Sequence, residues 1–241
     1  NLTFTQNKLR KSDELDNIED YRKSVGRSTS TIFGLQAEGL FGKDVQLAGH
    51  PLQSYGAYQV GDIAYADLNG DNMINDNDVT DLGQSFPTTT MGIDLSLNYK
   101  GFGLYILGTA TTGVTNILSS SYYWNNGLDG YSILALDRYH PVNNPTGTQP
   151  RLTTTSGANN YRTSSFWSEN GAFFRLKNVE LSYTLANKTG KFIGKDFKFF
   201  VRGTDLFVLS GIKDLDPERM LSGLTNYPTY RTITGGISIN F

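Results

Sequence analysis

The sequence has no cysteine, few charged residues and no long hydrophobic run. The absence of Cys from 241 residues excludes disulfide bridges, thiolate metal sites and cysteine nucleophiles. No apolar stretch reaches the roughly 20 residues that a transmembrane helix requires, although alternating membrane strands would escape such a search. The net charge of −2 gives no support for a nucleic-acid partner.

Aromatic residues and glycine are abundant instead. The chain contains 14 Tyr, 14 Phe and 26 Gly, a composition in which aromatic residues favour strands and glycine favours turns. The two histidines, His50 and His140, stand in no paired motif, and the chain has neither a nucleophile elbow nor a metalloprotease helix. We therefore expect an all-β protein without catalytic residues.

Apolar and polar residues alternate along several segments. Such a period of two predicts strands with one apolar face, because successive side chains point to opposite sides of a sheet. In the last segment, Ile233, Ile237, Ile239 and Phe241 share the apolar face. The predicted strands cover about six segments, namely 2–6, 91–99, 102–112, 178–185, 197–202 and 230–241.

The predicted connections are of two kinds. Those at 99–102 and 187–195 are short, whereas 8–89, 113–170 and 209–229 are long. Short turns on one side and long loops on the other are typical of outer-membrane barrels. Aromatic residues gather beside the short turns and the C-terminus, as an interfacial girdle would, at Tyr99, Phe102, Tyr183, Phe197 and Phe241.

The fold predicted from these patterns is an antiparallel transmembrane β-barrel. Six strands are too few to close one, since closure needs at least about eight. We therefore expect residues 1–241 to form the C-terminal part of a barrel domain, with earlier strands and any export signal lying outside this sequence. The alternation alone also fits an amphipathic sheet of a soluble sandwich.

An acidic segment within the first long loop, residues 67–78, has the spacing of an EF-hand or dockerin-type calcium loop. Position 6 is Asn72, where Gly is usual, although Asn tolerates the left-handed conformation. We expect a structural Ca²⁺ ion that pins an exterior loop without a core of its own, and the alternative is an Asx-rich turn without an ion. The candidate ligands, at positions 1, 3, 5, 7, 9 and 12, are Asp67, Asn69, Asp71, the Met73 carbonyl, Asn75 and Asp78.

The second long loop contains an aromatic cluster, Tyr122, Tyr123 and Trp124. Such rings stack on sugars or on peptide side chains, and they also pack loops together. Helical spacing at 128–139 predicts a short helix over the barrel mouth. The three aromatic residues are our candidates for substrate binding, with loop packing as the alternative.

Five short motifs occur in the order found in one known family. Over residues 61–241 they resemble the SusC-like, TonB-dependent transporters of Bacteroidetes, with Tyr139 where Trp is commoner. Residues 1–60 match loosely, through Glu38-Gly39-Leu40-Phe41. The motifs are Gly61-Asp62-Ile63 with Asp67-Leu68-Asn69-Gly70-Asp71, Tyr139-His140-Pro141 with Pro150-Arg151, Phe166-Trp167 running to Arg175-Leu176-Lys177-Asn178-Val179, Leu215-Asp216-Pro217-Glu218, and Tyr227-Pro228 with Arg231-Thr232.

The resemblance implies a larger transport protein in the bacterial outer membrane. It implies a barrel of roughly 22 strands, an N-terminal plug, contact with the TonB complex and a SusD-like surface lipoprotein acting as a lid. The expected substrates are oligosaccharides or peptides. The resemblance also implies that the terminal Phe241 is an outer-membrane assembly signal.

Two other functions remain open. One is a TonB-dependent receptor for a siderophore or vitamin, against which the 67–78 loop and the motifs at 175–179 and 216–218 argue. The other is a soluble, calcium-stabilised β-sandwich that binds carbohydrate. Detergent dependence would separate the sandwich from a membrane protein.

Overall fold

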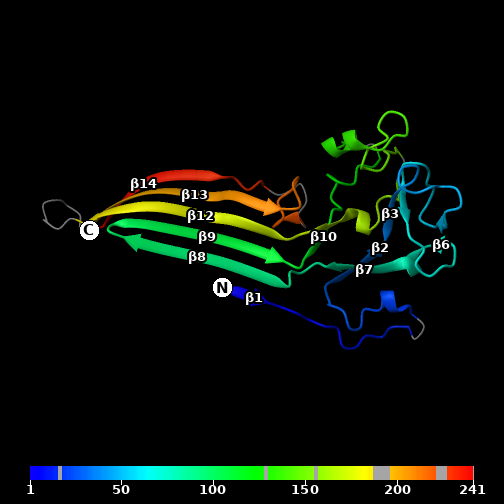
Figure 1. The fold of residues 1–241 in the computed structure, drawn as a ribbon, viewed down its shortest axis with the longest axis horizontal. Coiled ribbons are helices and arrows are strands. Elements are labelled where there is room, and N and C mark those ends of the chain that lie inside the picture. Colours follow the sequence, from blue (N-terminus) through cyan, green and yellow to red (C-terminus); the bar gives the residue numbers. More distant parts are fainter. Residues whose placement is uncertain (16–17, 128–129, 155–156, 187–195, 221–226, 241) are drawn as a thin grey trace.

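The protein consists of an extended sheet and a loop-built unit at one end of it (Figure 1). The structure is a computed structural model, and it describes residues 1–15, 18–127, 130–154, 157–186, 196–220 and 227–240. Among these residues, no helix is long and apolar enough to cross a membrane. The described elements are β-strands and short 3-10 helices, so the predicted all-β class is confirmed for this part of the chain.

Six antiparallel strands form the sheet, in the order β1-β8-β9-β12-β13-β14. The six predicted strands are confirmed, and β12 and β13 extend further toward the long loops than their alternation predicted. The sheet is open, with β1 and β14 as its edges. The bounds are β1 (Leu2–Phe4), β8 (Thr89–Tyr99), β9 (Phe102–Thr112), β12 (Phe173–Ala186), β13 (Asp196–Ser210) and β14 (Thr232–Asn240).

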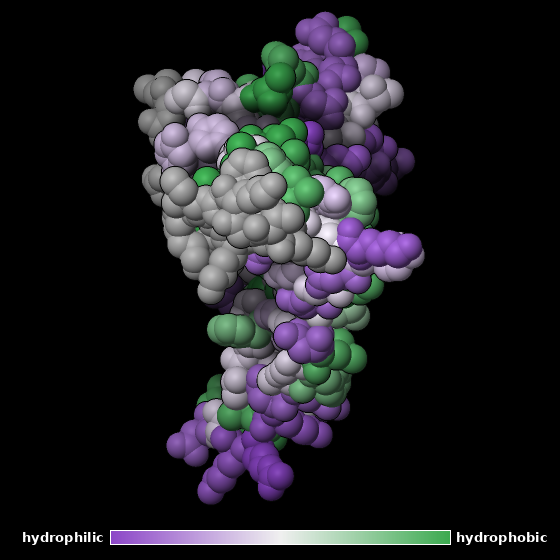
Figure 2. Space-filling model, turned by 90° about the vertical axis from the view of Figure 1, so that its left-hand side faces the viewer, coloured by the Kyte–Doolittle hydropathy of each residue, from purple (hydrophilic) through white to green (hydrophobic). Residues whose placement is uncertain are grey.

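One face of the sheet is apolar and uncovered. In the register, Leu95 lies beside Ile106, which lies beside Val179, so apolar residues of neighbouring strands share this face. Leu97 is 53% exposed and Ile237 is 63% exposed, and no other sheet pairs with or packs on these strands in the described residues. Hydrophobic side chains remain visible on the surface seen from the short-turn end (Figure 2). This exposure favours a lipid-facing sheet over a soluble sandwich, whose apolar faces would be packed together.

The opposite face, which would line a barrel interior, is polar. Glu180 of β12 contacts two cations of β13, with Lys198 Nζ at 2.7 Å and an ion pair to Arg202. The Phe200 ring lies on the same face and covers Gly236 of β14, where a Cβ atom would come within 2.6 Å of the ring. Phe200 therefore fits a face that is otherwise polar because Gly236 leaves room for it.

A β-bulge at Lys177 changes which side chains face inward. Against β9, Leu176 pairs with Gly108 and Asn178 with Leu107, so that Lys177 is an extra residue. Against β13 the register also shifts here, with residues 205–206 left opposite Lys177. An extra residue reverses the alternation of faces. As a result Arg175 lies on the same face as Asn178 and Glu180, whereas strict alternation would have turned it outward.

The short-turn end carries the predicted aromatic residues. Phe102 and Tyr183 lie with ring centroids 4.6 Å apart, and Tyr99 is 70% exposed. Gly101 takes φ +90° in the turn between β8 and β9, and a Cβ atom there would lie 2.8 Å from the Thr184 carbonyl oxygen. The predicted turn at 187–195 and Phe241 lie outside the described residues.

The loop unit is built from short elements of the two long loops that flank β8 and β9. β2 pairs with β7, β3 with β5, β4 with β6 and β10 with β11. Its strands are β2 (Thr31–Leu35), β3 (Ala37–Leu40), β4 (Leu52–Gln53), β5 (Ile63–Tyr65), β6 (Met73–Ile74), β7 (Val79–Gln84), β10 (Thr115–Ile117) and β11 (Ser168–Asn170). Its 3-10 helices are η1 (Asp20–Arg22), η2 (Asp76–Asp78), η3 (Ile133–Asp137) and η4 (Ser165–Trp167).

Two expectations about these loops were wrong. The loops have a core of their own, because residues from both of them pack into one buried cluster. The predicted helix at 128–139 is only the short 3-10 helix η3, and residues 128–129 lie outside the description. The buried cluster comprises Leu35, Leu40, Ile63, Tyr65, Ile74, Tyr123, Tyr139 and Trp167.

Candidate functional site

The acidic loop 67–78 is organised by backbone N–H groups that donate to its carboxylates. The Asp67 carboxylate accepts from Gly70 at 2.7 Å and from Asn72 at 2.8 Å. The Asp78 carboxylate, which is fully buried, accepts from Leu68 and Asn75, both at 2.8 Å. These bonds fold the loop on itself in the manner of successive Asx-turns.

The remaining candidate ligands lie on the outer side of the loop. The Asp71 carboxylate accepts from the Met73 N–H at 2.7 Å and from the Asn69 side-chain amide at 3.0 Å. The Asn75 side chain accepts from the Asn77 N–H and its amide donates to the Met73 carbonyl. Asn72 has φ 62°, as predicted for the residue that replaces the usual Gly.

Metal binding by this loop stays a prediction. Within the described ranges, no group of three or more His, Cys, Asp or Glu side chains is placed to hold a metal ion. The N–H bonds do not exhaust the carboxylates, since an ionised carboxylate offers about four lone-pair sites. Oxygen donors in this number and variety suit Ca²⁺ rather than a softer metal.

We expect Ca²⁺ to stabilise the loop unit and the substitution Asp67→Ala to abolish that effect. Calcium at about 100 times its Kd would add about 2.7 kcal/mol to the stability of the folded loop. The measurement is limited proteolysis of the full-length protein with and without calcium. Asp76→Ala is the matched control, because Asp76 is exposed, carries the same charge and is not a candidate ligand. Equal protection of both variants would leave the loop as an Asx-rich turn.

The candidate aromatic residues Tyr122, Tyr123 and Trp124 belong to the core and edge of the loop unit. The Trp124 ring lies 5.7 Å from that of Tyr161 and 6.4 Å from that of Trp167, centroid to centroid. Tyr123 is only 5% exposed, and burial raises the pKa of its hydroxyl to about 12. Packing accounts for these rings, and their role in substrate binding stays a prediction.

Two of the sequence motifs meet inside the loop unit. The carboxylate of Asp62 lies 2.8 Å from Arg151 Nε, across 89 residues of chain. The same carboxylate accepts from the Asn160 side chain at 2.7 Å, and Asn160 in turn accepts from the Ile63 N–H. Asn160 is 1% exposed and its role was not predicted, because an isolated Asn carries no signal in the sequence. This buried network fixes one loop against the other.

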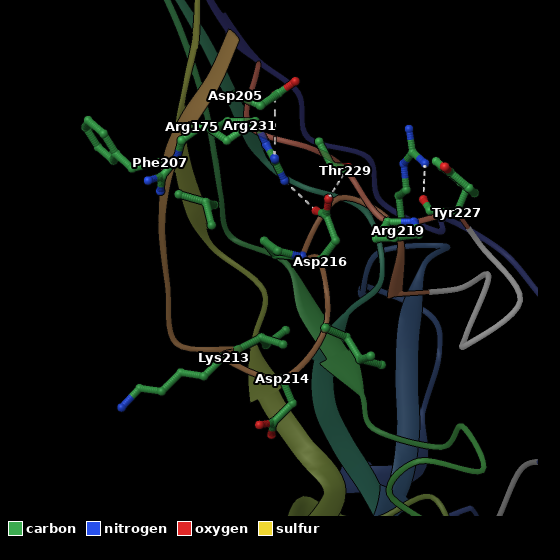
Figure 3. A pocket seen from close by; sticks show the side chains of 15 residues that line it. Arg175, Asp205, Phe207, Lys213, Asp214, Asp216, Arg219, Tyr227, Thr229 and Arg231 are labelled. Carbon is green, nitrogen blue, oxygen red and sulfur yellow. Dashed lines mark hydrogen bonds and ion pairs between the residues drawn. The ribbon is translucent and has the colours of Figure 1, made fainter. Parts of the chain in front are cut away.

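Two other motifs meet at the loop end of the sheet, around Arg175. Its guanidinium lies 2.5 Å from Asp216, 2.9 Å from Glu218 and 3.6 Å from Asp205. Figure 3 shows Arg175 directed at Asp205 and Asp216, with Thr229 donating to Asp216 from the other side. Arg175 therefore ties the segment after β13 to the inner face of β12.

Two cavities lie on either side of this segment. The first, of about 600 Å³, is lined among others by Arg175, Asp216, Arg219 and Tyr227 (Figure 3). The second, of about 490 Å³, is lined by residues of the sheet, the loop unit and the same segment. Cavities of this size suit small ligands. The lining of the second comprises Ser85, Pro87, Thr111, Val114, Asn116, Gly171, Phe173, Pro217, Glu218, Arg219 and Met220.

The chain is similar in sequence to two curated proteins of Formosa agariphila. It is 30% identical to "TonB-dependent receptor P26" over 244 residues, which cover 95% of this chain and 24% of that protein. It is 25% identical to "TonB-dependent receptor P3" over 194 residues, 73% of this chain and 19% of that protein. The chain thus spans about a quarter of the length of the curated relatives it matches. No protein-family model matches the chain.

The fold is similar to solved structures of a transporter. The RagAB peptide transporter matches with a TM-score of 0.64 and 18% identity, over 90% of this chain and 23% of that one. The RagAB peptide importer in its "closed-closed" state matches with a TM-score of 0.64 and 19% identity, over 91% and 24%. At such identities the likeness establishes the fold alone, an antiparallel sheet with its loops. Together with the receptor relatives and the ordered motifs, it places the chain in the family of SusC-like, TonB-dependent receptors.

Proposed function

We propose that the chain supplies wall strands and exterior loops to a SusC-like importer of the bacterial outer membrane. The observation that carries the proposal is the six-stranded antiparallel sheet, apolar and exposed on one face and polar on the other. Only a membrane makes such an exposed apolar face favourable in a monomeric wall. The described parts of the long loops lie at one end of the sheet, opposite the turn between β8 and β9 (Figure 1).

In the proposed mechanism, import is coupled to TonB, and parts of the complete protein outside this chain provide the coupling. A plug inside the barrel would rearrange when TonB pulls on it, and a SusD-like surface lipoprotein would close over the loops as a lid. The wall described above would hold the plug laterally and meet outer-membrane lipid on its apolar face. These partners are inferred from the family.

The proposed substrates are oligosaccharides or peptides. Peptide is favoured by the name of the RagAB structures, and the polar inner face accommodates either class. The relatives are named receptors and transporters, so we propose binding and import without catalysis. A siderophore or vitamin receptor is the alternative within the same fold.

The test is uptake by cells that carry the full-length protein. Fluorescent oligosaccharides and peptides should enter cells with the intact gene, and uptake should stop when either this gene or TonB is removed. Uptake of an iron–siderophore complex, with no oligomer uptake, would favour the alternative receptor. Recovery of the full-length protein in the soluble fraction without detergent would overturn the membrane assignment.

A further inference from the structure

The segment Asp216–Met220 forms a partition between the two cavities at the loop end of the sheet. Pro217 and Arg219 line both cavities. Asp216 lines only the first cavity, whereas Glu218 and Met220 line only the second. The second cavity is also lined by Thr111 and Phe173, which pair with each other across β9 and β12. Thr111 also pairs with Thr90, which lies two residues from Gly92 and four from Asp94 and therefore shares their face. The cavity therefore opens on the polar, inner face of the wall.

Charges around the partition are paired unequally. The carboxylates of Asp205, Asp216 and Glu218 all contact Arg175, and Glu218 also contacts Lys177 at 3.0 Å. Arg219 is exposed, and its guanidinium donates to a neutral acceptor, the Tyr227 carbonyl, at 3.2 Å. In the described part of the site these three carboxylates thus share two cations, Arg175 and Lys177, while the Arg219 guanidinium has donors left beyond its bond to the Tyr227 carbonyl.

A guanidinium with free donors beside a cavity prefers a carboxylate as its ligand. Its planar fork matches a carboxylate, with two parallel N–H···O bonds, better than it matches a neutral hydroxyl or amide. The remaining walls supply apolar surface from Phe173, Pro217 and Met220 and a polar amide from Asn116. Glu218 also lines this cavity, but its carboxylate is held by Arg175 and Lys177. Apolar walls with a guanidinium that has free donors can orient a small ligand.

We propose that Arg219 is a specificity-determining residue that binds a carboxylate group of the imported oligomer on the inner side of the barrel mouth. The proposal rests on the proposed import function and narrows its substrates to acidic oligomers. A uronate of an oligosaccharide and the free carboxylate of a peptide both present this group. The two sources are separated by the choice of probe.

The experiment measures binding by the detergent-purified full-length protein. Two probe pairs are used, tetragalacturonate against its methyl ester and a pentapeptide with a free C-terminus against its C-terminal amide. The wild-type protein should bind the acidic member of at least one pair more tightly. Arg219→Gln should weaken that binding about 10- to 100-fold, as expected for a hydrogen bond to a charged group. Binding of the neutral member should change less than about twofold, within the range of near-neutral contacts.

Two controls separate the role of Arg219 from general charge. Lys213→Gln removes a positive charge at the first cavity, but Lys213 points away from the acidic cluster in Figure 3 and should leave binding unchanged. Arg219→Lys keeps the charge without the fork and should give an intermediate affinity.

The outcomes are decisive in both directions. If the wild-type protein binds neither acidic probe, or binds both members of each pair equally, the proposal is overturned. The same holds if Arg219→Gln and Lys213→Gln weaken binding alike. Failure of oligomer uptake in cells would instead overturn the import function, because the binding assay does not depend on TonB.

Discussion

Replacing Leu95 by Arg should destabilise the membrane-embedded sheet by about 2–4 kcal/mol, the cost of a cation on the lipid face at mid-depth. Leu95 lies in the middle of β8, is 41% exposed and sits beside Ile106 on the apolar face. An Arg side chain there cannot reach water as easily as one near either end of the strand. The expected result is a strong loss of the full-length protein from the outer membrane, measured by surface labelling.

The control is the neighbouring residue. Ser96 is exposed on the opposite face, where it pairs with Tyr105, so that Ser96→Arg would place the same cation in the wet interior. This variant should reach the surface in nearly normal amounts. Equal loss of both variants would contradict the assignment of the two faces, and equal tolerance would argue that the apolar face does not meet lipid.

The strands of the sheet could be predicted because they carry local information. Period-two alternation is visible within nine or ten residues, and the strand Phe102–Thr112 was predicted with the bounds that the structure gives. The tight turn at Gly101 follows from its left-handed backbone, which a residue with a Cβ atom rarely adopts. In the loop at 67–78, Asn72 takes φ 62°, a conformation that Asn tolerates better than most residues with a Cβ atom.

The bulge and the motif pairing could not be predicted. Lys177 looks like one more residue of an alternating strand, and its extra position appears only when the partners of Leu176 and Asn178 are compared. Pairing of Asp62 with Arg151 depends on how two loops pack, which alternation does not encode. The core of the loop unit was missed for the same reason, since its residues come from both loops and form no periodic pattern.

Removing the Arg175 side chain by the substitution Arg175→Met should release the segment that follows β13. Three carboxylates converge on this guanidinium, which is 6% exposed, and without it they would repel one another. Breaking a buried pair costs about 3–5 kcal/mol. We expect about 2 kcal/mol here, because side chains of these carboxylates remain 21–31% exposed and water can solvate them.

The measurement is limited proteolysis after Arg219 in the full-length protein, compared with cleavage elsewhere. Lys177→Met is the matched control, because Lys177 is 37% exposed and contacts only Glu218 among these acids, so its loss should cost less than about 1 kcal/mol. Arg175→Lys should fall between the two, since a single ammonium cannot serve three carboxylates in the geometry of a fork. Faster cleavage in Arg175→Met alone would establish that the bulge at Lys177, by turning Arg175 inward, is what fastens this segment to the wall. Equal cleavage in Arg175→Met and Lys177→Met would assign the fastening to packing around the segment and not to the ion pairs.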